Sequence, residues 1–363
     1  MSQPRAQLDG LTGLRGLAAW LVVIYHVQSG AGAWMPPLAS SFFAKGYLAV
    51  DLFFVLSGFV IWLNYAAWFE ERGWAGYGAF LQKRLARIWP LHGFVMLIMF
   101  GLAIALMISG RPTGHDFPWA EFPMHFALIQ NWGFTSALSW NHPAWSISTE
   151  FAAYLTFPLL VLAAKPQRWP TAGLIAAIVG ICLVLAALFK AAGAIGLGSD
   201  IAQLGLIRCL CQFAIGCLIC IIWQRSAANT KMTTRIAGLL FVGACLVALT
   251  GFPSEALAFP LAIAPLLLFL AMNDGARWNL FRSRPLIWLG EISYSTYLIH
   301  FVGWRVFKLL FVADAANVSF GQTALFLILI LVGSFFSYHL IEQPGRRWFA
   351  GLRLKREDAV TTA

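Results

Sequence analysis

Charged residues are scarce in this sequence. Asp, Glu, Lys and Arg make up only 11% of its 363 residues, whereas 60% are hydrophobic and the mean hydropathy is +0.74. Soluble globular domains carry about 25% charged residues, so the composition excludes a water-soluble enzyme or binding module. It predicts an all-α polytopic integral membrane protein.

Cysteine is also rare, and its spacing argues against a metal centre. Cys217 and Cys220 are helix neighbours, but neither a second pair nor a group of histidines accompanies them, so we expect no bound metal. All six cysteines fall within apolar runs, where they act as small packing residues, and no disulfide framework is indicated.

The sequence has no basic patch, although its formal net charge is +10. Lys and Arg lie in short segments between apolar runs, whereas a nucleic-acid-binding surface needs them clustered. We therefore expect no nucleic-acid partner. A basic excess that is spread between apolar runs is typical of a membrane topology signal.

About ten apolar runs reach the roughly 20 residues that span a bilayer: 11–33, 46–67, 86–109, 145–164, 171–193, 201–224, 235–252, 255–272, 285–311 and 318–341. If the N-terminus is cytoplasmic, the inner segments hold every Lys and Arg except Lys45, Arg111, Lys190, Arg208, Arg305 and Lys308. This asymmetry predicts that both termini lie in the cytoplasm. We expect one transmembrane domain over 1–345 and a short basic cytoplasmic tail over 346–363.

The longest segment between apolar runs, about 110–144, is predicted to lie outside. It is rich in Trp, Asn and His, which suit contact with a sugar or a lipid headgroup. An interfacial aromatic belt explains the same composition equally well.

A second reading of the first apolar run is a cleaved signal peptide. Arg5 and Arg15 precede the apolar core, and the small residues Ala31-Gly32-Ala33 follow it. Cleavage there would remove His26 and leave the orientation of the later helices unchanged.

The first apolar run contains Arg15 and, eleven residues later, His26. Eleven helical steps bring the two side chains to within about 20° of one face, roughly 16 Å apart along the axis. Ionisable groups inside a membrane are costly and mark functional sites. The pair therefore predicts a site for a long molecule with a charged head.

Further polar side chains fall in the predicted outer half of other spans. They are Asp51, Glu150, Tyr154, Arg208 and His300. Charged groups in a bilayer line interiors or water-filled pockets, so the set predicts a cavity in which a carboxylate orients the imidazole of His26 as a general base. For a single member, such as Asp51 with Arg208, a helix-packing ion pair is a sufficient explanation.

Two arginines stand at the inner start of the third span. Arg84 and Arg87 are three residues apart and share a helix face. Together with Arg15 they predict a site for several phosphates, although residues that merely anchor topology follow the same pattern.

These residues resemble motifs of the acyltransferase-3 family of integral membrane O-acyltransferases, in the family's order and over nearly the whole chain. The matching residues are Arg15-x10-His26, Gly46 to Phe59, Arg84 with Arg87 and Pro90, Trp145-Ser146 with Glu150 and Tyr154, Ser293-Tyr294 through Tyr297-Leu298 to His300, and Glu342-Gln343-Pro344. Two departures stand out. Phe151 replaces a frequent second acid, and Gln343 replaces a frequent Lys or Arg.

The resemblance implies transfer of an acyl group, usually acetyl from cytoplasmic acetyl-CoA, to a hydroxyl of a glycan. It places the CoA phosphates at Arg84, Arg87 and Arg15. His26 would act as general base or as acyl acceptor, which the sequence does not separate. Glu150 and Asp51 would orient the imidazole, and Tyr154 or Arg208 would stabilise the oxyanion. Tyr297, His300 and Trp145 are further pocket candidates.

We therefore expect a multi-pass enzyme of the bacterial inner membrane that serves exopolysaccharide biosynthesis. Its expected partners are acyl-CoA, a glycan or lipid-linked oligosaccharide acceptor, and membrane lipid; a homodimer is left open. One alternative is acylation of a small secondary metabolite. Another is a proton-coupled transporter in which His26, Asp51 and Glu150 relay protons, but the sequence lacks the internal repeats typical of transporters.

Overall fold

A computed structural model describes residues 8–31, 34–249 and 254–361 of the chain. Within these ranges the regular structure is helical throughout, which confirms the predicted fold class. Arg5, Gly32 and Ala33, on which the signal-peptide reading depends, lie outside the described residues.

The chain divides into two units, which are described separately. Unit 1 comprises 1–18, 47–74 and 149–291, and unit 2 comprises 19–46, 75–148 and 292–363. Two helices, α1 (Asp9–Gln28) and α6 (Ala144–Leu159), run from one unit into the other.

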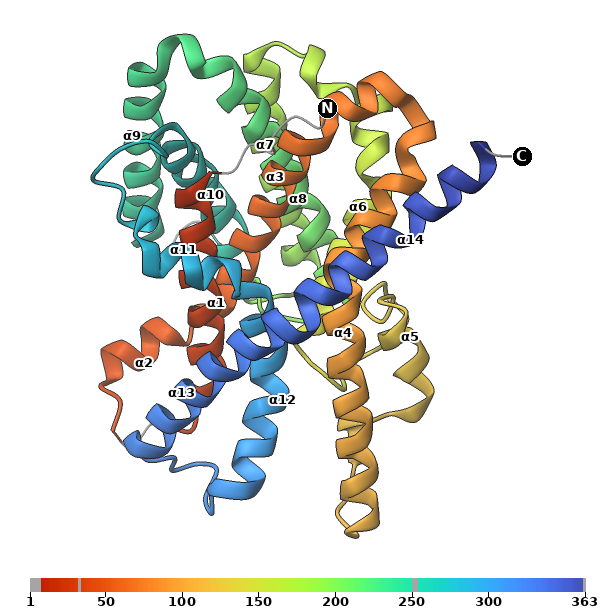
Figure 1. Ribbon diagram of the computed structural model, residues 1–363. Helices are drawn as coiled ribbons and strands as arrows, with labels where there is room; N and C mark the ends of the chain where they lie inside the picture. The colour runs from red at the N-terminus through yellow and green to blue at the C-terminus, as the bar shows by residue number, and fades with distance from the viewer. Residues whose placement is uncertain (1–7, 32–33, 250–253, 362–363) are drawn as a thin grey trace. The chain divides into compact units, whose positions relative to one another are not determined.

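Unit 1 also contains six helices of its own (Figure 1): α3 (Ala49–Arg72), α7 (Thr171–Ala191), α8 (Ile201–Arg225), α9 (Thr230–Leu249), α10 (Glu255–Met272) and α11 (Arg284–Glu291). Unit 2 contains α2 (Pro37–Phe43), α4 (Tyr77–Ile108), α5 (Phe122–Phe126), α12 (Ser293–Phe311), α13 (Phe320–Ser337) and α14 (Gln343–Thr361). Each of the predicted apolar runs corresponds to at least one of these helices.

The chain is a multi-pass membrane protein. Eight segments of the described chain are long and apolar enough to cross a bilayer, and one of them, Pro37–Ile108, includes both α3 and α4. The helix α12 is not among the eight, because its apolar surface is interrupted by Ser, Tyr, His, Arg and Lys side chains. Several of the polar side chains that lower the hydropathy of α12 belong to the candidate site described below.

Two predicted helix boundaries differ from the structure. The run 285–311 is not one helix, because α11 ends at Glu291 and α12 begins at Ser293. The helix α4 begins at Tyr77, well before the expected residue 86. The last helix, α14, continues as far as Thr361. The amphipathic ends of these helices lack the continuous apolar pattern from which spans are recognised.

The break before α12 has a physical cause in unit 1. A Cβ atom on Gly290 would lie 1.9 Å from the carbonyl oxygen of Thr12, so the backbones of α11 and α1 are in direct contact. Arg15 Nη2 donates to the carbonyl oxygen of Gly290 at 3.0 Å. A cation is favourable beside the unsatisfied carbonyls of a helix C-terminus, and Arg15 therefore caps α11.

A second close helix contact in unit 1 joins α3 and α8. A Cβ atom on Gly58 would lie 1.9 Å from the carbonyl oxygen of Phe213, and one on Gly216 would lie 2.0 Å from that of Val55. Small residues let backbones approach in this way, which is how helices associate where lipid supplies no hydrophobic driving force. The reciprocal glycines thus fix the separation and register of α3 and α8.

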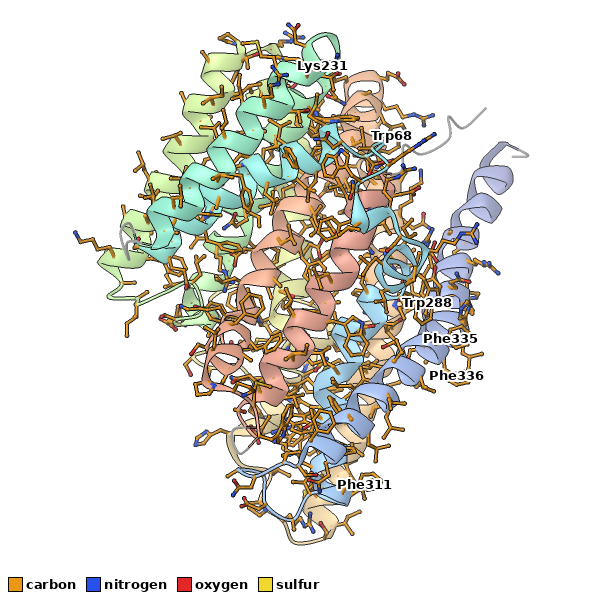
Figure 2. All side chains as sticks on the ribbon, turned by 90° about the vertical axis from the view of Figure 1, so that its left-hand side faces the viewer. Trp68, Lys231, Trp288, Phe311, Phe335 and Phe336 are labelled. Carbon is orange, nitrogen blue, oxygen red and sulfur yellow. The ribbon has the colours of Figure 1, made fainter. Side chains whose placement is uncertain are left out.

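The core of unit 2 lies between α1, α12 and α13. Val23, Val27, Trp304, Phe307 and Phe326 are among its buried members, and α12 and α13 run side by side (Figure 1). On the other side of α13, Phe335 and Phe336 point away from the neighbouring helices (Figure 2) and are 39% and 52% exposed. Such an outward apolar face is typical of contact with lipid.

We predict that Gly58→Ala and Gly216→Ala each lower the midpoint of thermal unfolding of the protein in detergent. The added methyl group would overlap a backbone oxygen and force the two helices apart, at a cost of about 1–3 kcal/mol. Gly243→Ala in α9 is the matched control, because its Cβ atom would meet nothing within 4 Å. A Gly58→Ala midpoint equal to that of the control would contradict the assigned contact.

Candidate active site

The predicted relation between Arg15 and His26 depends on a single helix, and the structure has one. Both residues lie in α1, which continues without interruption from Asp9 to Gln28. His26 occupies the last turn and is only partly buried, so its ring keeps access to its surroundings.

His26 forms a pair with His300 in unit 2. His26 Nδ1 lies 3.2 Å from His300 Nε2, and the ring centroids are 4.9 Å apart. Each ring also touches the backbone of its own helix: His26 Nδ1 lies 2.9 Å from the carbonyl oxygen of Val22, and His300 Nδ1 lies 3.3 Å from that of Thr296. His300 is fully buried.

These contacts assign the tautomers of both rings. A carbonyl oxygen only accepts hydrogen bonds, so Nδ1 of each histidine carries the proton. In a neutral His300, Nε2 then has a lone pair and accepts from His26 Nδ1–H, whose proton is shared with the carbonyl oxygen of Val22. The lone pair of a neutral His26 is therefore on Nε2, the atom that a general base or a nucleophile uses.

Aromatic side chains frame this pair. The Phe301 ring lies 5.6 Å from the His26 ring in an edge-to-face arrangement, and the His142 ring stacks on Phe301 at 4.6 Å with an interplanar angle of 24°. Tyr297 lies on the other side, 5.9 Å from the His300 ring. The hydroxyl oxygen of Tyr297 is 2.7 Å from Ser146 Oγ and donates to the carbonyl oxygen of Pro143 at 3.0 Å.

The segment that precedes α6 is hydrogen-bonded to α12 close to these aromatic side chains. Asn141 Nδ2 donates to the carbonyl oxygen of Leu298 at 3.1 Å. The preceding residue, Trp140, is fully buried and has a φ of +52°, a left-handed conformation that is strained for a bulky side chain. Strain of this kind is concentrated at functional sites, and here it sets the direction of Asn141 and His142.

Asp51 and Arg208 form a buried ion pair in unit 1. Arg208 Nε donates to Asp51 Oδ1 at 2.8 Å and Nη2 donates to Oδ2 at 2.5 Å, while Nη1 donates to the carbonyl oxygen of Leu197 at 2.7 Å. Gln212 Nε2 adds a further contact to Asp51 Oδ1 at 3.3 Å. The two charges are 0% and 1% exposed and neutralise each other, as the packing alternative predicts.

Glu150 has different partners, also in unit 1. Its Oε1 atom accepts from the Tyr154 hydroxyl at 2.5 Å and from Ser57 Oγ. The expected relation between Glu150 and Tyr154, one turn apart on α6, is therefore a direct hydrogen bond. Ser57 was not predicted, and it neighbours Gly58 in the contact between α3 and α8.

The predicted phosphate site contains a structural ion pair. Arg84 and Arg87 lie on α4 in unit 2, and Arg87 Nη1 is ion-paired with Oε1 of the buried Glu342. Ser295 Oγ donates to Glu342 Oε2 at 2.7 Å, and the Arg87 guanidinium lies 5.1 Å from the centroid of the Tyr294 ring. One arginine of the pair thus connects α4, α12 and the start of α14.

The structure brings together some of the sequence-predicted residues within each unit. His26, His300 and Tyr297 are grouped in unit 2, and Trp145 is buried at the start of α6 beside Ser146. Asp51 with Arg208, and Glu150 with Tyr154, are the pairs of unit 1.

Three residues that make the contacts described above, His142, Phe301 and Glu342, were not predicted as site members. The only signals for them are a histidine in the long outer segment, the residue that follows His300, and the acid of the closing motif. Among the residues that the structure describes, no group of three His, Cys, Asp or Glu side chains could hold a metal ion.

Comparison with known proteins identifies relatives over the whole chain. The acyltransferase domain of the acyltransferase-3 family matches residues 8–339. The acyltransferase MdmB of Streptomyces mycarofaciens is 30% identical over 98% of this chain and 95% of its own length.

The peptidoglycan O-acetyltransferase OatA of Listeria monocytogenes is 23% identical over 82% of this chain, but over only 49% of its own length. The chain therefore spans about half of that relative and nearly all of MdmB. No solved structure matches the chain.

We predict that the stability of the protein falls as the pH is lowered from 6.5 to 4. Burial, helped by neighbouring positive charge, lowers the pKa of His125 to about 3 and that of His142 to about 4. In the unfolded chain both would titrate near 6.5. Below that value the unfolded state binds more protons than the folded state, so acid favours unfolding by up to about 1.4 kcal/mol per pH unit for each histidine.

The measurement is the unfolding midpoint in detergent between pH 8 and pH 4.5. His142→Gln should flatten the dependence, whereas His115→Gln, at an exposed position of the same segment, should leave it unchanged. Equal slopes for His142→Gln and the wild type would show that His142 is not buried as a neutral ring.

Proposed function

The chain belongs to the acyltransferase-3 family of membrane O-acyltransferases, and from this premise we propose that it moves an acyl group, acetyl in the simplest case, from cytoplasmic acyl-CoA to a hydroxyl of a cell-surface or lipid-linked glycan. Family membership makes it an acyltransferase. The glycan is supported by the similarity to a peptidoglycan O-acetyltransferase. The bacterial relatives support an inner-membrane location, where acyl-CoA is available from the cytoplasm.

The observation that carries the proposal is the pair of contacts that His26 Nδ1 makes. They hold the proton on Nδ1 and leave the lone pair on Nε2. As general base, Nε2 takes the proton of the acceptor hydroxyl while the hydroxyl oxygen attacks the thioester carbonyl and the thiolate of CoA leaves. As nucleophile, Nε2 attacks the thioester carbonyl and takes the acyl group while the thiolate of CoA leaves. In a second step the hydroxyl oxygen attacks this acyl group, the bond to Nε2 breaks, and the hydroxyl proton goes to the thiolate.

His300 serves both routes in the same way. When His26 Nε2 gains a proton or an acyl group, the ring becomes cationic, and its Nδ1–H becomes a stronger donor to the lone pair of His300 Nε2. A charge-assisted hydrogen bond is about twice as strong as a neutral one. His300 thus takes the position that a carboxylate holds behind the histidine of a catalytic triad.

On the donor side, we propose that Arg84 and Arg87, with Arg15, attract the phosphates of CoA. Guanidinium groups bind phosphate oxygens in pairs, and Arg84 and Arg87 share one face of α4. Arg87 also neutralises Glu342 and Arg15 also caps α11, so both have structural work besides any contact with a donor. Donor binding is therefore tested at Arg84, whose substitution breaks neither of these two contacts.

We further propose that Glu150 and Tyr154 take part in the reaction as one polar unit, with the tyrosine hydroxyl oriented by the carboxylate. An oriented hydroxyl can donate to a developing oxyanion. For Asp51 and Arg208 the proposed roles are positioning the imidazole and stabilising charge. Their mutual neutralisation makes their effect on the reaction indirect.

We predict that His26→Ala abolishes transfer of labelled acetyl groups from acetyl-CoA in membranes or detergent, a loss of at least about a hundredfold. The protein should still insert and fold, because His26 is only partly buried. His115→Gln is the control, since this histidine is exposed. Activity of His26→Ala near that of the wild type would refute the role of the ring.

The same assay tests the role of His300 as a positioning residue. His300→Leu removes the acceptor of His26 Nδ1–H and should lower kcat about tenfold or more with little change in KM. His300→Gln should recover part of the rate, because its amide oxygen can accept the same proton. Equal rates for the Leu and Gln variants would show that His300 only fills space.

We predict that Arg84→Gln weakens binding of CoA about tenfold, in line with the loss of one charge-assisted contact to phosphate. Lys83→Gln, at the adjacent exposed position, is the matched control, and the dissociation constant can be measured by calorimetry on the purified protein. Arg87→Gln should instead lower stability, because it leaves Glu342 buried without its cation. An unchanged dissociation constant for Arg84→Gln would indicate that Arg84 serves topology alone.

A further inference from the structure

A second polar cluster lies in unit 2, toward the end of α12 that we predict to be outer. Arg305 is ion-paired with Asp116, and its guanidinium lies 5.0 Å from the centroid of the Phe117 ring and 5.5 Å from that of Phe301. One turn on, Lys308 Nζ lies 5.7 Å from the centroid of the Trp304 ring. The reaction proposed above uses none of these charges.

The ion pair uses only part of the guanidinium. Asp116 accepts from Nη2 of Arg305 and is itself 53% exposed, whereas the Arg305 side chain is only 19% exposed. Nη1 of Arg305 is buried and has no hydrogen-bond partner among the described residues, and the same holds for Nε2 of His142. A buried polar atom without a partner costs about 1–3 kcal/mol, and more if it is charged, so each such atom needs an explanation.

Charge selects the kind of group that would satisfy these atoms. Arg305 and Lys308 together outweigh Asp116 by one positive charge. His142 stacks on the Phe301 ring, and burial lowers its pKa to about 4, so that it is neutral and adds no charge at pH 7. A half-buried site with an excess cation and an unused guanidinium N–H favours an anion over a neutral ligand.

The cluster adjoins the reacting ring. Phe301 contacts the rings of His26 and His142 and also lies under the Arg305 guanidinium. A single aromatic ring therefore separates Arg305 from His26. An acceptor whose hydroxyl reaches His26 Nε2 would extend along Phe301 toward Arg305, and sugars pack well against aromatic faces.

The backbone conformation near Trp140 also places the polar groups of this cluster close to α12. The strained conformation of Trp140 holds Asn141 and His142 toward α12, and the Trp140 amide donates to the carbonyl oxygen of Asp116 at 2.8 Å. The carboxylate that partners Arg305 and the histidine with the buried Nε2 are thus positioned by one residue.

We propose that Arg305, Lys308 and His142 form a subsite for an anionic group of the acceptor, a carboxylate or a phosphate, so that the enzyme acylates an acidic glycan rather than a neutral one. The assignment of the anion to the acceptor rests on the proposed function. The anion-binding site itself rests on the geometry of Arg305, Asp116 and Phe301.

The experiment measures binding by calorimetry on the full chain in detergent, without an acyl donor. The probes are methyl β-glucuronide for a carboxylate, glycerol 3-phosphate for a phosphate, and methyl β-glucoside as the neutral match of the first. The proteins are the wild type, Arg305→Gln, Arg305→Lys and Asp116→Asn. Arg111→Gln, at an exposed cation of the same unit, is the control.

We expect the wild type and Arg111→Gln to bind at least one anionic probe and to bind the glucoside at least tenfold more weakly. Arg305→Gln should lose about tenfold to a hundredfold in affinity for the anion, and Arg305→Lys should keep part of it. Asp116→Asn should bind the anion several-fold more tightly, because it removes a competing negative charge. If Asp116 only stabilised the fold, Asp116→Asn would instead weaken binding of the anion.

The outcomes separate this inference from the proposed function. Binding of the glucoside that is as tight as binding of both anionic probes, or an anion affinity that Arg305→Gln leaves unchanged, overturns the subsite even if acetyl transfer is found. Anion binding that depends on Arg305 supports the subsite even if acetyl transfer is absent. The preferred probe identifies the anion as a carboxylate or a phosphate.

Discussion

The proton on Nδ1 of His26 is shared between the carbonyl oxygen of Val22 and Nε2 of His300, and the chemistry of the site follows from this arrangement. It leaves the lone pair of His26 on Nε2 and provides an acceptor for the charge that forms when Nε2 reacts. His300 is in turn held by the carbonyl oxygen of Thr296. The backbones of α1 and α12 thus set the orientation of the reacting ring, and a change in the register of these helices would alter it.

The other ionisable groups follow the rule that a charge inside a membrane protein needs a partner. Asp51 is neutralised by Arg208 in unit 1, and Glu342 by Arg87 in unit 2. These pairs hold helices together where lipid is as apolar as the side chains and burial gives little driving force. They also explain why residues with motif-like spacing need not touch a substrate. The structural need for a partner is enough to specify them.

Much of the fold and part of the site could be predicted from the sequence. Hydropathy located the spans, and the cost of charge in lipid identified His26, Arg208 and His300 as residues with a specific role. The partners could not be predicted, because a hydrogen bond depends on how helices far apart in sequence are aligned. The pairing of His26 with His300 was therefore missed, although both histidines had been selected. The break after Glu291 was missed because it arises from a backbone contact between Gly290 and Thr12.

The ion pair between Arg87 and Glu342 joins residues that are 255 positions apart in the chain. During synthesis, α4 is complete long before this carboxylate exists, so the pair can form only after α12 and α13 have been made. The contact thereby gives the assembly of unit 2 an order: α4 reaches its final position against the segment that precedes α14 only when all the intervening helices are present.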